Sequence, residues 1–260
     1  MTDKLPTLEV TDVTSDRLQR LQMQIEFESL PDVEKVLSLA ASVCTAFGRA
    51  ACVGAFAPRA ALRRQSFLAL RSAPVLEDGR VVAEFDVIAI DTSSFQFFRN
   101  MMLGLNDAGA AMERIILVAA GSREPPQALA QIDDRNESSL YPRVPPPLAI
   151  GQVGFSPSEF SKSRRVLIEF SEFPSPPEMD VLQSYVDSWY DLLELGAFCQ
   201  PFGTPDETIG IRGSFTRFDS TSVEAHIQRY IGSEVGFKIL GSMLDHYADL
   251  VYPILSVEFD

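Results

Sequence analysis

The chain has 260 residues, with 36 acidic side chains against 22 basic ones and a formal net charge of −14. Hydrophobic residues make up 46% of the chain, which is enough for a sizeable core and argues against global disorder. The length allows one large domain or two small ones. The negative charge argues against nucleic-acid binding, because contact with phosphates needs clustered Lys and Arg.

The sequence gives no sign of a membrane span, a secretion signal or a metal centre. The longest conspicuous apolar run, Ile115–Ala120, has the length of a strand and falls far short of the ~20 residues that cross a bilayer. The first ten residues lack the apolar core of a signal peptide. Cys44, Cys52 and Cys199 are an odd number without CxxC spacing. We therefore expect a cytoplasmic protein without a disulfide framework, metal or cofactor.

The first part of the chain alternates strand and helix patterns. Met23, Ile25 and Phe27 alternate with polar residues, which is typical of a strand with one polar face. The expected elements are strands at Leu8–Val13 and Met23–Phe27, a helix from Pro31 to near Gly48, strand-like pieces at Cys52–Phe56 and Phe67–Leu70, a strand at Val81–Ile90, a helix at Phe95–Ala108 and a strand at Met112–Ala120.

A segment rich in Pro and charge, residues 121–147, predicts an exposed linker, which can also be a partner-binding loop, and the order of elements then repeats. The expected elements after the linker are a strand at Leu148–Val153, a strand at Val166–Phe170, a helix at Glu178–Leu195, strands at Thr208–Phe218 and Val223–Ile231, a helix at Glu234–Leu250 and a strand at Ile254–Phe259.

Three stretches recur in the same order, which indicates an internal duplication. Pro6, Leu8, Val10 and Val13 match residues 140 positions later, and Ile25-Glu26-Phe27 recurs as Ile168-Glu169-Phe170, 143 positions later. Phe98–Val118 aligns without a gap with Phe237–Val257, 139 positions later. Strand, helix, strand, strand, helix, strand is the split βαβ order of the ferredoxin-like superfold. We therefore predict an α+β protein of two tandem ferredoxin-like lobes, residues 1–120 and 148–260, each with an extra N-terminal strand.

The sequence offers no catalytic set. His226 and His246 are the only histidines, and no nucleophile elbow, HExxH, phosphate-binding loop or GxGxxG accompanies them. The structural interpretation of both histidines is therefore favoured, and we expect a protein that is not an enzyme.

The clearest surface pattern is acidic. On the helix that begins near Glu178, four carboxylates fall within about 40° of one line at 100° per residue, opposite an apolar stripe that contains Trp189. The candidate partner-binding residues are Asp180, Asp187, Asp191 and Glu194, followed by Asp206 and Glu207 on a turn. These carboxylates form either a solvated face or a docking surface for a basic partner.

The two-part layout, the acidity and the stretch Trp189…Leu195-Gly196-Ala197-Phe198 resemble the immunity-52 family, whose members accompany bacterial polymorphic and type VI secreted toxins. The resemblance implies a cytoplasmic protein that binds a nuclease-type toxin and blocks it. Two other classes stay open, namely a small-molecule-binding or regulatory module with a ligand site between the lobes, and a cofactor-free or carboxylate-metal enzyme. The sequence leaves the oligomeric state open.

Overall fold

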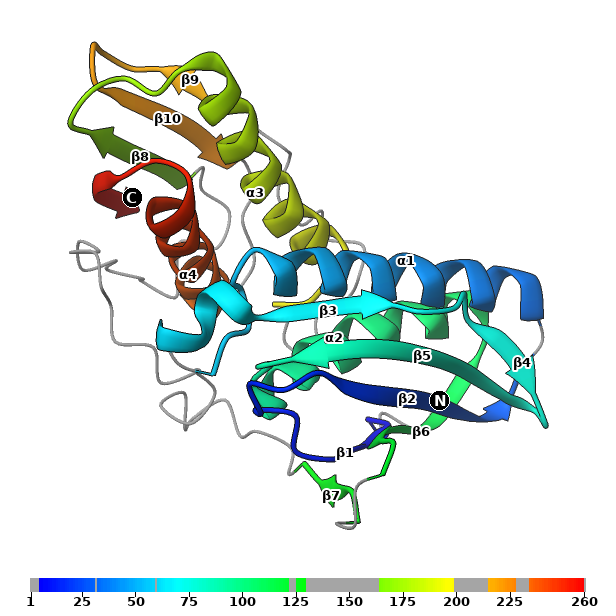
Figure 1. Cartoon of the computed structure of the whole chain (residues 1–260). Helices are drawn as coiled ribbons and strands as arrows, with labels where there is room; N and C mark the ends of the chain where they lie inside the picture. The colour runs from blue at the N-terminus through cyan, green and yellow to red at the C-terminus, as the bar shows by residue number, and fades with distance from the viewer. Residues whose placement is uncertain are drawn as a thin grey trace. The chain divides into compact units, whose positions relative to one another are not determined.

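The chain is mixed α+β, as expected, and is described by a computed structural model over residues 5–30, 32–58, 60–121, 125–129, 164–198, 215–227 and 234–259 (Figure 1). It divides into two compact units. Unit 1 is Met1–Cys52 with Phe56–Arg143, and unit 2 is Val53–Ala55 with Val144–Asp260.

Unit 1 is built on a seven-stranded sheet of order β3-β5-β2-β6-β1-β7, in which β4 also pairs with β5. Its strands are β1 (Thr7–Val10), β2 (Gln19–Ser29), β3 (Phe67–Leu70), β4 (Val75–Glu77), β5 (Arg80–Ile88), β6 (Ala111–Ala119) and β7 (Gln127–Ala128). All neighbours are antiparallel except β1 and β6, which run parallel. The alternation read from the sequence of β2 is confirmed for Met23 and Ile25, which are fully buried between half-buried polar residues. It fails at Phe27, which is half-buried because the pairing with β6 shifts register after Glu26.

Two helices of unit 1 share a core with the buried face of this sheet. The helical segments are α1 (Val33–Cys52), η1 (Ala60–Gln65), η2 (Thr92–Ser94), α2 (Phe95–Met102) and η3 (Leu103–Ala108). Phe98 of α2 contacts both Phe47 of α1 and Phe85 of β5, with ring centroids 5.3 and 6.4 Å away. Phe47 also stacks on Phe56 at 4.4 Å. These rings join α1, α2 and the sheet into one apolar interior.

α1 alone among the described helices is long and apolar enough to cross a membrane by length and composition. The sequence predicted no apolar segment of that length, and α1 is an exception to this prediction. The core helix of a soluble fold passes the same test, and half of the apolar window of α1 is buried inside the protein. Its buried residues include Val36, Ala40, Phe47 and Ala51, which recur at helical spacing.

Unit 2 contains a four-stranded antiparallel sheet of order β11-β8-β10-β9. Its elements in chain order are β8 (Arg164–Phe170), α3 (Pro176–Glu194), β9 (Thr216–Arg217), β10 (Ser222–Ile227), α4 (Glu234–Leu250) and β11 (Ile254–Phe259). The start of α3 is fixed by Ser175, whose backbone N–H donates to the Glu178 carboxylate at 2.6 Å. The indole of Trp189 donates to the carbonyl of Gly236 at 2.7 Å, which ties α3 to α4.

The two sheets share their central strand order. In unit 1, β2 follows the extra strand β1 in the chain and lies between β6 and β5 in the sheet. In unit 2 the corresponding strand, β8, lies between β11 and β10. On its other side, β5 pairs with β3 and β4 in unit 1, and β10 pairs with β9 in unit 2. Each unit therefore places its strands in the same order relative to its two helices.

The ungapped alignment of the two halves does not extend through the last strand. α2 and α4 begin 139 positions apart, as predicted, but Ile25 pairs with Ile115 whereas Ile168 pairs with Val257. Judged by strand pairing, the residue of β11 that corresponds to Ile115 is Val257 and not Ile254. The reason is length, because α4 has 17 residues where α2 and η3 have 8 and 6.

One predicted strand is wrong, and several predictions lie outside the described residues. Cys52–Phe56 is not a strand, since Cys52 ends α1 and residues 53–56 form a turn in which Gly54 has a φ of 82°. The apolar run there continues the buried side of a helix. The predictions that lie outside the described residues are the strand Leu148–Val153, residues 208–214 and 228–231 of two further strands, and most of the 121–147 linker.

Candidate functional site

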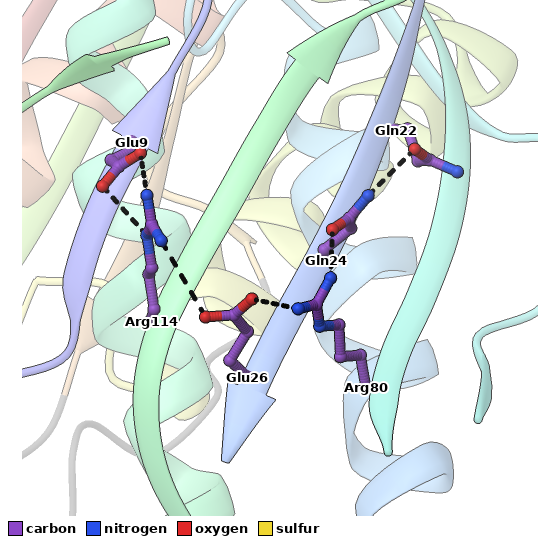
Figure 2. A network of polar contacts seen from close by, with 6 residues as sticks. All are labelled: Glu9, Gln22, Gln24, Glu26, Arg80 and Arg114. Atoms are coloured by element: carbon purple, nitrogen blue, oxygen red, sulfur yellow. Dashed lines mark hydrogen bonds and ion pairs between the residues drawn. The ribbon is translucent and has the colours of Figure 1, made fainter. Parts of the chain in front are cut away.

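A polar network covers part of the sheet face of unit 1 that points away from the buried side (Figure 2). We call it the open-face network, and its residues are Glu9, Gln22, Gln24, Glu26, Arg80 and Arg114. Arg114 holds Glu9 with two hydrogen bonds, of 2.9 Å from Nε and 2.6 Å from Nη2. Glu26 lies between the two arginines, 4.0 Å from Arg114 and 3.1 Å from Arg80. Opposite charges therefore alternate across four strands.

The network continues along β2 through amides. Arg80 Nη1 donates to Gln24 Oε1 at 3.5 Å, and Gln24 Nε2 donates to Gln22 Oε1 at 3.1 Å. Strand register sets this arrangement, because Glu26 is paired with Arg114 and its neighbour Ile25 is paired with Val81.

The electrostatics of the open-face network suit binding of a partner better than acid–base catalysis. The hydrogen bond from Arg114 to Glu9 raises the pKa of the Arg114 guanidinium, which therefore stays charged at any physiological pH. The arginine side chains are 40–50% exposed and the two carboxylates about 20%, so the network presents donors to solvent. Two Arg and two Glu balance, so the six residues of the network together carry no net charge.

The acidic residues predicted on α3 occupy two different environments. Asp180 and Glu194 are exposed, whereas Asp187 and Asp191 are half-buried. Gln183 donates to Asp187 Oδ1 at 3.0 Å. The predicted apolar stripe is confirmed, with Trp189 at 0% exposure. Tyr190 and Leu192 are also at 0%, so α3 is more enclosed than a one-sided amphipathic helix. Asp206 and Glu207 lie outside the described residues.

The two histidines have separate surroundings. His226 is on β10, half-exposed, with Nε2 3.5 Å from Glu224 Oε1. His246 is on α4 and 5% exposed, and its Nδ1 lies 2.7 Å from the hydroxyl of Tyr185 on α3. Burial raises the pKa of Tyr185 to about 12, so this hydroxyl stays neutral at physiological pH. The pair joins two core helices and supplies no nucleophile.

Two of the three cysteines, Cys44 and Cys52, lie in the described part of the chain. Cys44 is buried, and burial raises the pKa of its thiol; Cys52 is half-buried, and its pKa is raised by the same cause. Cys199 lies outside the described residues. Within the described ranges, no three His, Cys, Asp or Glu side chains gather closely enough to hold a metal ion.

Sequence reasoning placed two of the six residues of the open-face network on a polar strand face. Gln24 and Glu26 of β2 were read from their alternation with apolar residues, but neither Arg80 nor Arg114 was linked to them. The available signal was strand parity, since Arg80 and Arg114 each directly precede a buried strand residue, Val81 and Ile115 respectively.

No protein-family model matches the chain, and neither does any curated protein sequence.

Proposed function

We propose that this chain is a cytoplasmic immunity protein that binds a nuclease-type bacterial toxin and neutralises it by protein–protein contact. The support comes from charge and surface, together with the resemblance to the immunity-52 family. A nuclease presents basic surface to the phosphates of its substrate, and a chain with a net charge of −14 has the complementary sign. Complementary charge steers encounter and fixes orientation.

The observation that carries this proposal is the exposure of Asp180 and Glu194 on a helix whose opposite side is completely buried. Trp189 and its hydrogen bond to Gly236 fix the rotation of α3 about its own axis. The two carboxylates, 14 positions apart along the helix, are therefore presented on a firm support. A preorganised acidic surface loses little conformational freedom on binding.

We also propose that the two units descend from one duplicated ferredoxin-like unit. The shared strand order and the shared strand–helix–strand–strand–helix–strand succession support this origin. Such units have helices on one face of the sheet only. The free face of unit 1, with its open-face network, is then a second surface available to a partner.

The test of the immunity proposal is the association rate with a candidate nuclease toxin. The double variant Asp180→Lys/Glu194→Lys is compared with Asp16→Lys/Glu77→Lys, which changes the net charge equally at exposed positions of unit 1. We expect the α3 variant to associate markedly more slowly at low salt, with the difference shrinking at high salt. Circular dichroism verifies that both variants are folded.

Equal rates for the two variants would reject α3 as the contact surface. If the wild-type chain does not bind the toxin at all, the immunity proposal itself is wrong.

A further inference from the structure

Arg99 is a buried cation that has no hydrogen-bond or ion-pair partner among the described residues. It lies on α2 and is 5% exposed. Its Nε has no hydrogen-bond partner, and none of the residues that the structure describes forms an ion pair with its guanidinium. Burial lowers the pKa of this guanidinium, and no carboxylate in the described part of the chain offsets the effect.

This situation is unusual for an arginine. Charged side chains are almost never buried unless they are paired, since removing a charge from water costs several kcal/mol. The contrast within unit 1 is direct, because Arg80 and Arg114 are both paired with carboxylates although they are far more exposed. Within the described residues, the charge of Arg99 is therefore not compensated by an opposite charge.

A second buried polar side chain lies one helical turn from Arg99. Gln96 is 6% exposed and precedes Arg99 by three positions, which places both residues on the same side of α2. Arg99 has five N–H donors in a planar fork, and the amide of Gln96 adds two more. A group with two or more acceptor oxygens would satisfy these donors together.

We propose that Arg99 and Gln96 form a binding site for an oxyanion, a carboxylate or phosphate group. Both groups match the guanidinium fork, which can hold two of their oxygens with parallel N–H···O bonds. The bound anion compensates the charge of Arg99 within the low-dielectric interior, where that charge is otherwise costly. The site is independent of the proposed immunity function, since it involves neither α3 nor the open-face network.

The experiment measures thermal unfolding of the full chain with increasing sodium phosphate or sodium acetate, against sodium chloride at equal ionic strength. The variants are Arg99→Met and the control Arg80→Met, which removes one exposed arginine from the same unit. We expect the midpoint temperature of wild type and Arg80→Met to rise with one of the two anions beyond the chloride effect, following mass action. Arg99→Met should show the chloride effect only.

The comparison of phosphate with acetate identifies the anion, because only the preferred one saturates at millimolar concentration. If wild type responds to neither, or if Arg99→Met responds as wild type does, the site does not exist. Arg99→Lys provides a second test in case the Met variant does not fold. It keeps the charge but loses the fork, so calorimetric titration should show at least tenfold weaker binding, and unchanged binding would overturn the proposal.

Discussion

Gly48 lies at the closest approach of α1 to the sheet, and replacing it with alanine tests that packing. A methyl group at this position would lie 2.8 Å from the backbone oxygen of Leu68 on β3 and 3.4 Å from its Cδ2. The obstacle is strand backbone, which cannot rotate away as a flexible side chain can. Helix and strand would have to separate by several tenths of an ångström.

Two opposing effects set the magnitude. Alanine favours a helix interior over glycine by about 1 kcal/mol, whereas overpacking a close contact typically costs about 1–3 kcal/mol. We therefore expect Gly48→Ala to lower the free energy of unfolding by about 1 kcal/mol. Gly104 is the matched control, because a methyl group there meets no atom within 4 Å. Gly104→Ala should be neutral or stabilise by about 0.4–1 kcal/mol.

Urea denaturation followed by far-UV circular dichroism measures both variants. The expected order of unfolding midpoints is Gly104→Ala at or above wild type, with Gly48→Ala below it and no change in slope. If Gly48→Ala is as stable as Gly104→Ala, then α1 does not approach β3 as closely as the structure shows, and the packing argument is refuted.

Three further predictions concern single contacts. Tyr185→Phe removes the hydroxyl that bonds His246 and should lower the free energy of unfolding by about 1–3 kcal/mol in urea titration; no loss would show that this bond contributes nothing. Hydrogen bonds from Thr221 and Ser222 lower the pKa of Asp219 below 3.8, so their stabilisation is present above pH 3.8 and is lost as the pH falls through the lowered folded pKa. Asp219→Ala should therefore differ from wild type in thermal midpoint at pH 6 and approach it near pH 2, and a difference independent of pH would contradict this linkage. Glu9→Gln should cost less than about 1 kcal/mol in the same urea assay, because Arg114 is 40% exposed and water screens its pair with Glu9, and a larger loss would mark the open-face network as structural.

The sequence predicted the buried faces of single elements better than the contacts between elements. The buried face of β2 follows from a period of two, and the burial of Trp189 follows from the stripe on α3, because each pattern lies within one element. The pairing of Glu26 with Arg80 and Arg114 depends on the register of three strands, which no single strand encodes.

The burial of Arg99 could not be predicted for a similar reason. An arginine on a short helix is expected at the surface, and the matching residue of the other half, Lys238, is indeed exposed. What encloses the polar side of α2 is tertiary packing, which propensity and periodicity do not describe. Cys52–Phe56 was misread because a short apolar run has the same appearance in a strand and at the end of a buried helix.

Nuclease activity of the candidate toxin, titrated with the purified chain, tests the central claim most directly. The account predicts that cleavage of nucleic acid falls in proportion to added chain and is abolished near one equivalent, because immunity–nuclease pairs are among the tightest protein complexes. Cleavage that continues undiminished in a large excess of the folded chain would contradict the immunity function.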